Sequence, residues 1–355
     1  MNILRGESTM NKIAVIPGDG IGPEVVAQGL KIIEYFDAKF KIEKFDIGAE
    51  RYLAEGELIT DEMLKKLETF DAIYLGAVGD PRVKPGVLEK GILLKLRFYF
   101  EQYINLRPVK LMKDEYSPLK DKGINEINFT VIRENTEGLY AGVGGFFKKN
   151  TVDEIATQEM IATRKGVERI IDYAFKFAQT NGDSQKVTLC DKSNVLTYAH
   201  DLWQRVFSEK SKQYSHVPTD HCLVDALTMK MVRNPEDFDI IVICNMFGDI
   251  VTDLAAELQG GMGLSASANI NPDGVSMFEP VHGSAPDIAG ENKANPIAAI
   301  LAAAMMLKHF DLEQEANKVE TAVQQALNEN KLTVDMGGSL STSEFGDYIL
   351  KLVKK

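Results

Sequence analysis

The chain has 355 residues, 45% of them hydrophobic and 26% charged, a composition typical of a soluble globular protein with one large or two smaller α/β domains. Its formal net charge of −12 argues against nucleic acid or an anionic membrane as the main partner, so an anionic ligand must be bound by local Arg and Lys clusters. No apolar run reaches the length of a membrane span or has the form of a signal peptide. The three cysteines, Cys190, Cys222 and Cys244, lack CxxC spacing, so we expect reduced, buried thiols in a cytoplasmic protein.

Strands and helices alternate along the first hundred residues. Apolar runs predict strands at 13–16, 40–47 and 72–75, and helical periodicity predicts helices at 24–36, 61–67 and 88–103. This βαβαβ order indicates a mostly parallel sheet covered by helices. The turn at 18–22 reads G-x-G-x-G, whereas a Rossmann dinucleotide site needs G-x-G-x-x-G, so we do not expect such a site there. Met10 could be an alternative start, and the sequence leaves the order of residues 1–9 open.

The middle and the end of the chain continue the α/β pattern. Expected strands lie at 127–132, 187–190, 217–224 and 239–244. Expected helices are one at 158–179, one that carries Trp203, and others at 225–232, 250–258, 294–309 and 312–328. Glycine and aromatic residues near 142–156 predict a projecting hairpin or arm. We expect residues 263–271 to form an extended segment and residues 277–287 to form a loop.

Two acidic residues, Asp249 and Asp253, follow the apolar run at 239–244. Gly248 would turn the chain off that strand, and the i, i+4 spacing then places both carboxylates on one helix face, about 6 Å apart at Cβ. Carboxylates held this close suit Mg²⁺ or Mn²⁺. A charge pair that only complements the helix dipole is an equally good interpretation from these residues alone.

Basic and hydroxyl side chains recur where strands or helices end. Arg97, Arg107 and Arg133 could clamp carboxylates, although each alone could equally be a surface arginine. Tyr140 and Lys192 could exchange protons with a ligand, although such residues taken alone are more often structural than catalytic. In the segment 282–287, small residues would let a ligand approach the backbone, and Asp287 could accept ribose hydroxyls. A plain turn explains that segment as well.

Ordered motifs over nearly the whole chain resemble the metal-dependent β-decarboxylating dehydrogenases, the family of isopropylmalate, isocitrate, homoisocitrate and tartrate/D-malate dehydrogenases. These motifs are IPGDGIGPE at 16–24, GAVGDP at 76–81, NLRP at 105–108, RENTEGLYAG at 133–142, DKSNVL at 191–196, NMFGDIVTD at 245–253, ANINPDG at 268–274 and FEPVHGSAPDIAG at 278–290. The resemblance implies two α/β domains that share a large mixed sheet, without a Rossmann fold. It places the cofactor-side domain at 1–105 and 261–355, and the dimerisation and metal/substrate domain at 106–260.

The resemblance also implies that the substrate is a small 2-hydroxy diacid, and it implies a role for each site residue in the oxidation of this substrate. Substrate carboxylates would be bound by Arg97, Arg107 and Arg133. Tyr140 and Lys192 would be the acid/base pair. Mg²⁺ or Mn²⁺ would be held by Asp249 and Asp253 of one chain and by Asp225 of the second chain of a homodimer. Lys192 and Val195 would enter the site from that second chain together with Asp225. NAD would lie on His282, Gly283, Ser284, Ala285, Asp287 and Asn295. Asp287-Ile288 stands where NADP-dependent relatives have a Lys-Tyr pair, so NAD is favoured.

The segment 89–97 distinguishes branches of the family by their substrate. It is similar to the E-x-G-L-L-x-L-R helix of the isopropylmalate branch, with one extra residue after Gly91, and Leu93, Leu94 and Val195 would form an apolar pocket. Core packing is the other interpretation of the leucines. RENTEG, GDPRV and QYINLRPV are more typical of the tartrate/D-malate branch, but isopropylmalate enzymes of the actinobacterial type combine these features. We therefore expect the isopropylmalate branch, with tartrate/D-malate as the alternative; a non-catalytic subunit would have lost part of the site, which is complete here.

Overall fold

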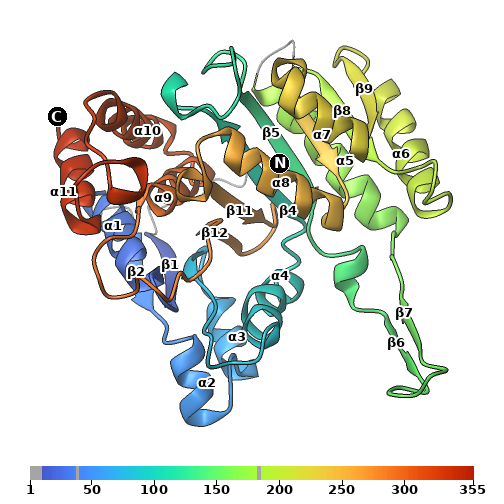
Figure 1. Ribbon diagram of the computed structural model, residues 1–355, viewed down its shortest axis with the longest axis horizontal. Helices are drawn as coiled ribbons and strands as arrows, with labels where there is room; N and C mark the ends of the chain where they lie inside the picture. The colour runs from blue at the N-terminus through green and yellow to red at the C-terminus, as the bar shows by residue number, and fades with distance from the viewer. Residues whose placement is uncertain (1–9, 37–39, 182–184) are drawn as a thin grey trace. The chain divides into compact units, whose positions relative to one another are not determined.

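The computed structural model describes residues 10–36, 40–181 and 185–355, so residues 1–9 lie outside the described part (Figure 1). The chain divides into two compact units. Unit 1 contains the described residues up to Phe100 and those from Ala266 onward, and unit 2 is Glu101–Ser265. Both combine helices with parallel and antiparallel strands, which confirms the predicted mixed α/β class.

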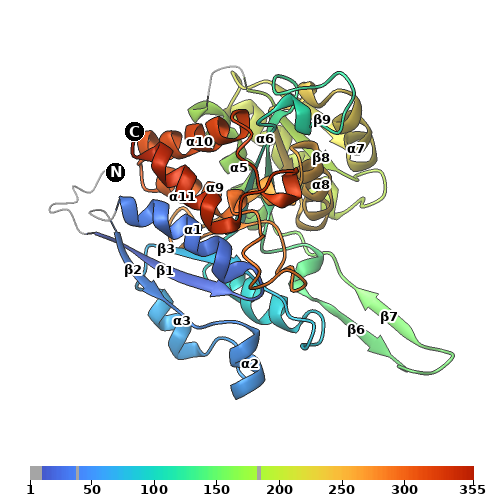
Figure 2. The ribbon, with the colours of Figure 1, turned by 60° about the vertical axis from the view of Figure 1, so that its left-hand side comes forward.

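Unit 1 contains five strands in the order β2-β1-β3-β12-β11, parallel except for the β11–β12 pair. Their bounds are β1 Asn11–Gly18, β2 Phe40–Lys44, β3 Ala72–Ala77, β11 Ala266–Ile270 and β12 Ser276–Pro280. The helices are α1 Gly22–Tyr35, α2 Ala49–Glu55, α3 Asp61–Leu67, the π-helix Glu89–Leu94, α4 Lys95–Tyr99, α9 Ile297–His309, α10 Glu313–Asn328 and α11 Thr342–Val353. Helices α1, α9 and α11 cover one face of these strands and α2 and α3 the other (Figure 2). Because β3 is buried along its whole length, its sequence is continuously apolar.

Apart from a two-stranded arm, unit 2 contains five strands in the order β4-β5-β10-β8-β9, of which only the β4–β5 pair is antiparallel. Their bounds are β4 Ile104–Lys110, β5 Asn128–Glu134, β8 Val187–Asp191, β9 Thr219–Leu223 and β10 Ile240–Ile243. Its helices are α5 Arg164–Thr180, α6 Ala199–Gln213, α7 Val224–Arg233 and α8 Asn245–Leu258. Helices α7 and α8 bury Leu227, Met231, Val251 and Ala255 against one strand face.

A two-stranded arm extends from the body of unit 2 (Figures 1 and 2). It consists of β6 Gly144–Phe147 and β7 Ile155–Gln158, paired antiparallel, with every residue of both strands exposed. No helix in the described part of the chain combines the length and apolar character that crossing a membrane requires.

Several predicted elements need correction. The helix expected from 158 begins at Arg164, because β7 takes residues 155–158 and the Thr163 hydroxyl caps the helix by accepting from the Gly166 N–H at 3.0 Å. The loop expected from 277 begins inside β12. Gly248 does not turn the chain off a strand: α8 starts at Asn245, so Gly248 lies within its first turns. Helices α2 and α11 were not predicted.

Candidate active site

Helix α8 carries the two aspartates of the predicted metal pair. It starts directly after β10, and Asp249 and Asp253 lie one turn apart, so the expected shared helix face is confirmed. The pKa of Asp253 is raised, first by burial and then by the negative charge of Asp249, while Arg107 and Arg133 oppose the shift. An additional cation between the two carboxylates would relieve this repulsion.

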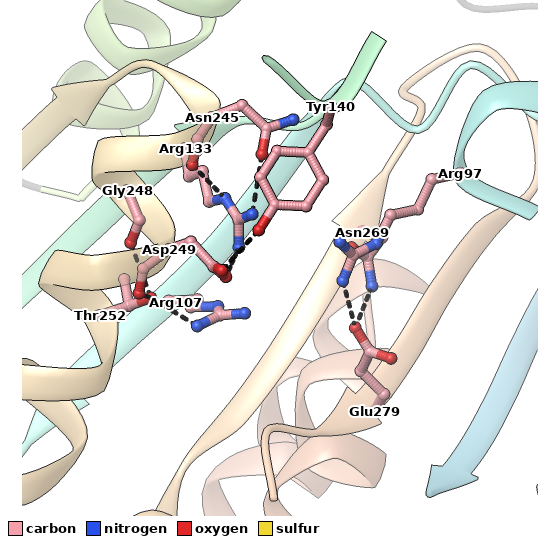
Figure 3. Close-up of polar contacts among 10 residues, drawn as sticks. All are labelled: Arg97, Arg107, Arg133, Tyr140, Asn245, Gly248, Asp249, Thr252, Asn269 and Glu279. Atoms are coloured by element: carbon pink, nitrogen blue, oxygen red, sulfur yellow. Dashed lines mark hydrogen bonds and ion pairs between the residues drawn. The ribbon is translucent and has the colours of Figure 1, made fainter. Parts of the chain in front are cut away.

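The Asp249 carboxylate is the centre of a polar cluster (Figure 3). Arg133 Nη1 lies 2.6 Å from one of its oxygens, and the Tyr140 hydroxyl donates to the other at 2.6 Å. Arg133 Nε and Nη2 also donate to the backbone and side-chain oxygens of Asn245, at 2.8 and 2.7 Å. With 1% of its surface exposed, Arg133 is fixed from three directions by the first turns of α8.

Gly248 allows Arg133 to reach this position. A Cβ added to Gly248 would lie 2.6 Å from Arg133 Cγ and 2.9 Å from its Cδ, closer than any side chain can approach. The glycine therefore provides space for the aliphatic part of the Arg133 side chain against the helix. This role, and not the predicted turn, explains why a glycine occupies position 248.

The register of β4 and β5 brings a second arginine to the cluster. Arg133 pairs with Asn105 and Val131 pairs with Arg107, so Arg107 and Arg133 are diagonal neighbours on one face of the antiparallel pair. Arg107 is 8% exposed and its Nη1 donates to the Thr252 hydroxyl of α8. Two guanidinium groups thus lie beside one helix turn, an arrangement suited to a dianionic ligand.

Tyr140 lies in the short 3₁₀ helix Leu139–Ala141, with its ring centroid 5.4 Å from the Arg133 guanidinium. Burial raises the pKa of Tyr140, and its bond to Asp249 raises that pKa further, against an opposing effect of Arg133. The hydroxyl therefore stays protonated at neutral pH and can donate a proton.

The remaining predicted proton carrier, Lys192, lies elsewhere in unit 2. It follows β8, and its Nζ is 2.7 Å from a carboxylate oxygen of Asp225 in the first turn of α7. This lysine lowers the pKa of Asp225. Within the described residues no three His, Cys, Asp or Glu side chains are grouped closely enough to hold a metal. Within one chain, Asp225 therefore does not form a three-ligand metal site with Asp249 and Asp253. Val195, three residues after Lys192, is 65% exposed.

In unit 1, Arg97 is 4% exposed and donates through Nη2 to Glu279 of β12 at 3.0 Å. Asn269 of β11 donates to the same carboxylate oxygen at 2.7 Å (Figure 3). Glu279 thus orients the guanidinium. Its role was not predicted, although Glu279 lies within the FEPVHGSAPDIAG motif, because Arg97 and Glu279 are 182 residues apart in the sequence and meet only through tertiary packing.

The segment of unit 1 expected to bind a cofactor is supported by the N-terminal glycine turn. The Ile21 N–H donates to the Ser284 carbonyl at 2.8 Å, and a Cβ on Gly20 would lie 2.0 Å from that oxygen. His282 Nε2 is buried without a hydrogen-bond partner, and burial lowers the pKa of His282. Such an orphaned polar atom beside exposed Gly283 and Asp287 suits a polar ligand.

Asn295 lies close to the start of α9. It donates to Asp335 at 3.0 Å and accepts from the Ile297 N–H at 3.0 Å. These bonds fix its orientation, and its neighbour Ala294 packs in one apolar cluster with Ala285. The φ of Ala285, +37°, is unusual for a residue with a side chain.

The segment in which the sequence predicted an extra residue after Gly91 forms a π-helix, Glu89–Leu94, ahead of α4. A π-helical turn of this kind is rare and occurs frequently at functional sites. Ile92 and Leu96 face the core, whereas Leu93 packs against the same cluster but is only partly buried, as is Leu94. Both leucines therefore keep apolar surface that a ligand can contact.

Paired carboxylates on one helix turn, buried arginines and a protonated tyrosine are chemically suited to an anionic hydroxy acid and a divalent cation. The isocitrate/isopropylmalate dehydrogenase family matches residues 12–349, and the chain belongs to this family. It is 49% identical over 96% of its length to a 3-isopropylmalate dehydrogenase of Thermobifida fusca, covering 97% of that protein. It is 51% identical over 95% of its length to the 3-isopropylmalate dehydrogenase of Streptomyces coelicolor, covering 96% of it. The crystal structure of isocitrate dehydrogenase from Methylococcus capsulatus has a TM-score of 0.89 and 36% identity, over 98% of this chain and all of that one.

Proposed function

We propose that the protein is a 3-isopropylmalate dehydrogenase of leucine biosynthesis, which oxidises and β-decarboxylates (2R,3S)-3-isopropylmalate to 4-methyl-2-oxopentanoate with NAD⁺. The Asp249 cluster carries this proposal, because one carboxylate contacts both Arg133, which suits a substrate carboxylate, and Tyr140, which holds a transferable proton. The names of the relatives from Thermobifida fusca and Streptomyces coelicolor support the substrate.

The residues fit both cofactors. Asp249 and Asp253 offer oxygen ligands of like charge, and the raised pKa of Asp253 indicates that a further cation would be stabilising. The segment 282–287 fits NAD. His282 Nε2 has no hydrogen-bond partner, Gly283 and Asp287 are exposed, and the Ser284 carbonyl is held by the Ile21 N–H. When bound, Mg²⁺ or Mn²⁺ would polarise the substrate's hydroxyl and adjacent carboxylate, and NAD⁺ would accept the hydride.

The protein's own residues bind the substrate and move two protons. Arg97, Arg107 and Arg133 bind the carboxylates, as fixed guanidinium groups do through paired hydrogen bonds. In its neutral amine form, Lys192 takes the proton of the substrate's hydroxyl group while hydride leaves the carbon that carries this hydroxyl. After the β-carboxylate is lost as CO₂, the Tyr140 hydroxyl gives its proton to the carbon left behind.

The substrate's isopropyl group is assigned to Leu93, Leu94 and Val195, an apolar contact that contributes about 1–3 kcal/mol to discrimination. In the RENTEG segment, which departs from common isopropylmalate enzymes, the residues after Arg133 make hydrogen bonds within unit 2. Thr136 donates its N–H and its hydroxyl to Glu134, both at 2.8 Å, and Glu137 accepts the N–H of Thr163 at 2.9 Å. This segment therefore shapes the loop before Tyr140, which gives no reason to prefer D-malate or tartrate.

The functional unit in this proposal is a homodimer with shared sites. Exposed apolar side chains gather on the outward faces of α7 and α8 and along the arm, which is typical of an association surface. They are Met229, Val232, Ile250, Phe146, Phe147, Val152 and Ile155. A second copy would supply Lys192, Val195 and Asp225 to the site formed by Asp249 and Asp253. The three free, buried cysteines suit the reducing cytoplasm, where we place the protein.

Mixing two inactive variants tests the shared site. Asp249→Asn and Lys192→Ala chains, unfolded and refolded together, should form heterodimers in which one site holds the native Asp249 of one chain and the native Lys192 of the other. Random pairing should then restore about one quarter of wild-type activity. No recovery above the separately refolded variants, with heterodimers demonstrated by mass, would show that each site lies within one chain.

The chemistry is tested by product stoichiometry. With 3-isopropylmalate, NAD⁺ and Mn²⁺, we expect equal amounts of NADH, CO₂ and 4-methyl-2-oxopentanoate, and loss of all three in Asp249→Asn. As a matched acidic control, Asp237→Asn, in the short 3₁₀ helix Pro235–Asp237, should keep wild-type turnover. NADH without CO₂, or full activity of Asp249→Asn, would contradict the proposal.

A further inference from the structure

A buried histidine contacts the backbone of Lys192. His200 lies in the first turn of α6 and is 1% exposed. Its Nδ1 accepts a hydrogen bond from the Lys192 N–H at 2.7 Å. No motif of the sequence indicates this contact, since His200 lies outside the DKSNVL segment at 191–196.

The bond fixes the chemical form of the imidazole. A ring nitrogen that accepts a hydrogen bond carries no proton, so neutral His200 must be protonated at Nε2. Nε2 is buried and has no hydrogen-bond partner in the described structure, and the ring meets Phe247 of α8 edge-on, with centroids 5.7 Å apart. Burial lowers the pKa of His200, although the charge of Asp191 opposes this effect. The ring is therefore neutral at physiological pH and remains an acceptor.

Both backbone groups of Lys192 are occupied as a result. Its carbonyl accepts the N–H groups of Val195 at 3.0 Å and Leu196 at 2.9 Å, and its N–H is bound by His200. The His200 N–H in turn donates to the Leu196 carbonyl at 3.0 Å, which ties α6 to the same turn. The Lys192 side chain thus starts from a rigid backbone before its Nζ reaches Asp225 at 2.7 Å.

We propose that His200 is a positioning residue that sets the location of the Lys192 amino group through the hydrogen bond from the Lys192 N–H to His200 Nδ1. Core packing alone would need a ring of this shape but not an acceptor at Nδ1. The catalytic consequence rests on the proposed function, in which Lys192 is the base; the hydrogen bond itself does not.

The tautomer can be measured without any activity. With ¹⁵N-labelled histidine, the native protein at neutral pH should show one buried imidazole with an unprotonated Nδ1 and a protonated Nε2, absent from the spectrum of His200→Asn. The chain has five histidines, so single substitutions can assign every ring. A His200 ring protonated at Nδ1 would overturn the proposal even if the enzyme is fully active.

Two substitutions separate positioning from packing. His200→Leu removes the acceptor, whereas His200→Asn keeps an oxygen close to the position of Nδ1. We expect kcat to fall on the order of 10- to 100-fold in His200→Leu, with KM for NAD⁺ within about twofold, as expected for a displaced catalytic group. His200→Asn should recover most of kcat. As a matched control, His216→Leu, at an exposed position, should leave both constants unchanged.

Equal kcat losses in His200→Leu and His200→Asn, with matching losses of thermal stability, would overturn the proposal and assign His200 to packing. If His200→Leu does not fold, the tautomer decides. If the wild type is inactive with 3-isopropylmalate, the proposed function fails; the His200 ring measurement still tests the hydrogen bond.

Discussion

Gly248→Ala should inactivate the enzyme out of proportion to its effect on stability. The added methyl carbon would lie 2.6 Å from Arg133 Cγ, about 1 Å inside a normal carbon–carbon contact. Arg133 would have to shift by a similar distance, and its bonds to Asn245 at 2.7 and 2.8 Å and to Asp249 at 2.6 Å would lengthen or break. A misplacement of this size costs on the order of 100-fold in activity.

The stability change should be small, because two effects oppose each other. Alanine gains about 1 kcal/mol of helix propensity over glycine. Overpacking against Arg133 costs about 1–3 kcal/mol. We therefore expect the free energy of unfolding, measured by urea denaturation, to fall by about 0–2 kcal/mol, while kcat/KM falls roughly 100-fold.

A double-mutant cycle identifies the contact responsible. In an Arg133→Ala background most of the obstructing stem is gone, so Gly248→Ala should be neutral or stabilising by up to about 1 kcal/mol. The reasoning is refuted if Gly248→Ala destabilises both backgrounds equally, or if it leaves kcat/KM within about twofold of wild type.

Two further substitutions test separate parts of the site. Tyr140→Phe should lower kcat about 10²–10⁴-fold. The pKa of Tyr140 is raised in the folded protein, so this tyrosine contributes stability below its unfolded pKa of about 10. That contribution is lost as pH rises through the folded pKa. The melting temperature of Tyr140→Phe should therefore fall less steeply above pH 10 than that of the wild type. An unchanged kcat would remove Tyr140 from the chemistry. Gly20→Ala should weaken NAD⁺ binding in calorimetry, because its Cβ would lie 2.0 Å from the Ser284 carbonyl. Gly56→Ala, which also has a positive φ but no neighbour within 4 Å, should leave NAD⁺ affinity unchanged; equal losses in both would indicate general backbone strain.

The sequence predicts features that depend on local spacing. The i, i+4 relation of Asp249 and Asp253 follows from helical periodicity after an apolar run, and α8 confirms it. The segment at 88–103 was expected to be helical, but the π-helical form of Glu89–Leu94 depends on how Ile92 and Leu96 pack into the core.

Contacts between distant segments were beyond sequence reasoning. The diagonal placement of Arg107 and Arg133 depends on the β4–β5 register, which a one-residue slip would reverse. Glu279 and His200 reach Arg97 and Lys192 only through tertiary packing. Gly248 was assigned to a turn because glycine usually marks one, whereas here the missing side chain accommodates Arg133.

Substrate preference is the most direct test of the proposed function. With NAD⁺ and Mn²⁺ held constant, kcat/KM for 3-isopropylmalate should exceed that for D-malate by on the order of 10- to 100-fold, the discrimination that apolar contact with an isopropyl group provides. Leu93→Asn should narrow this ratio by lowering activity with 3-isopropylmalate alone. A higher kcat/KM for D-malate in the wild type would contradict the proposed substrate.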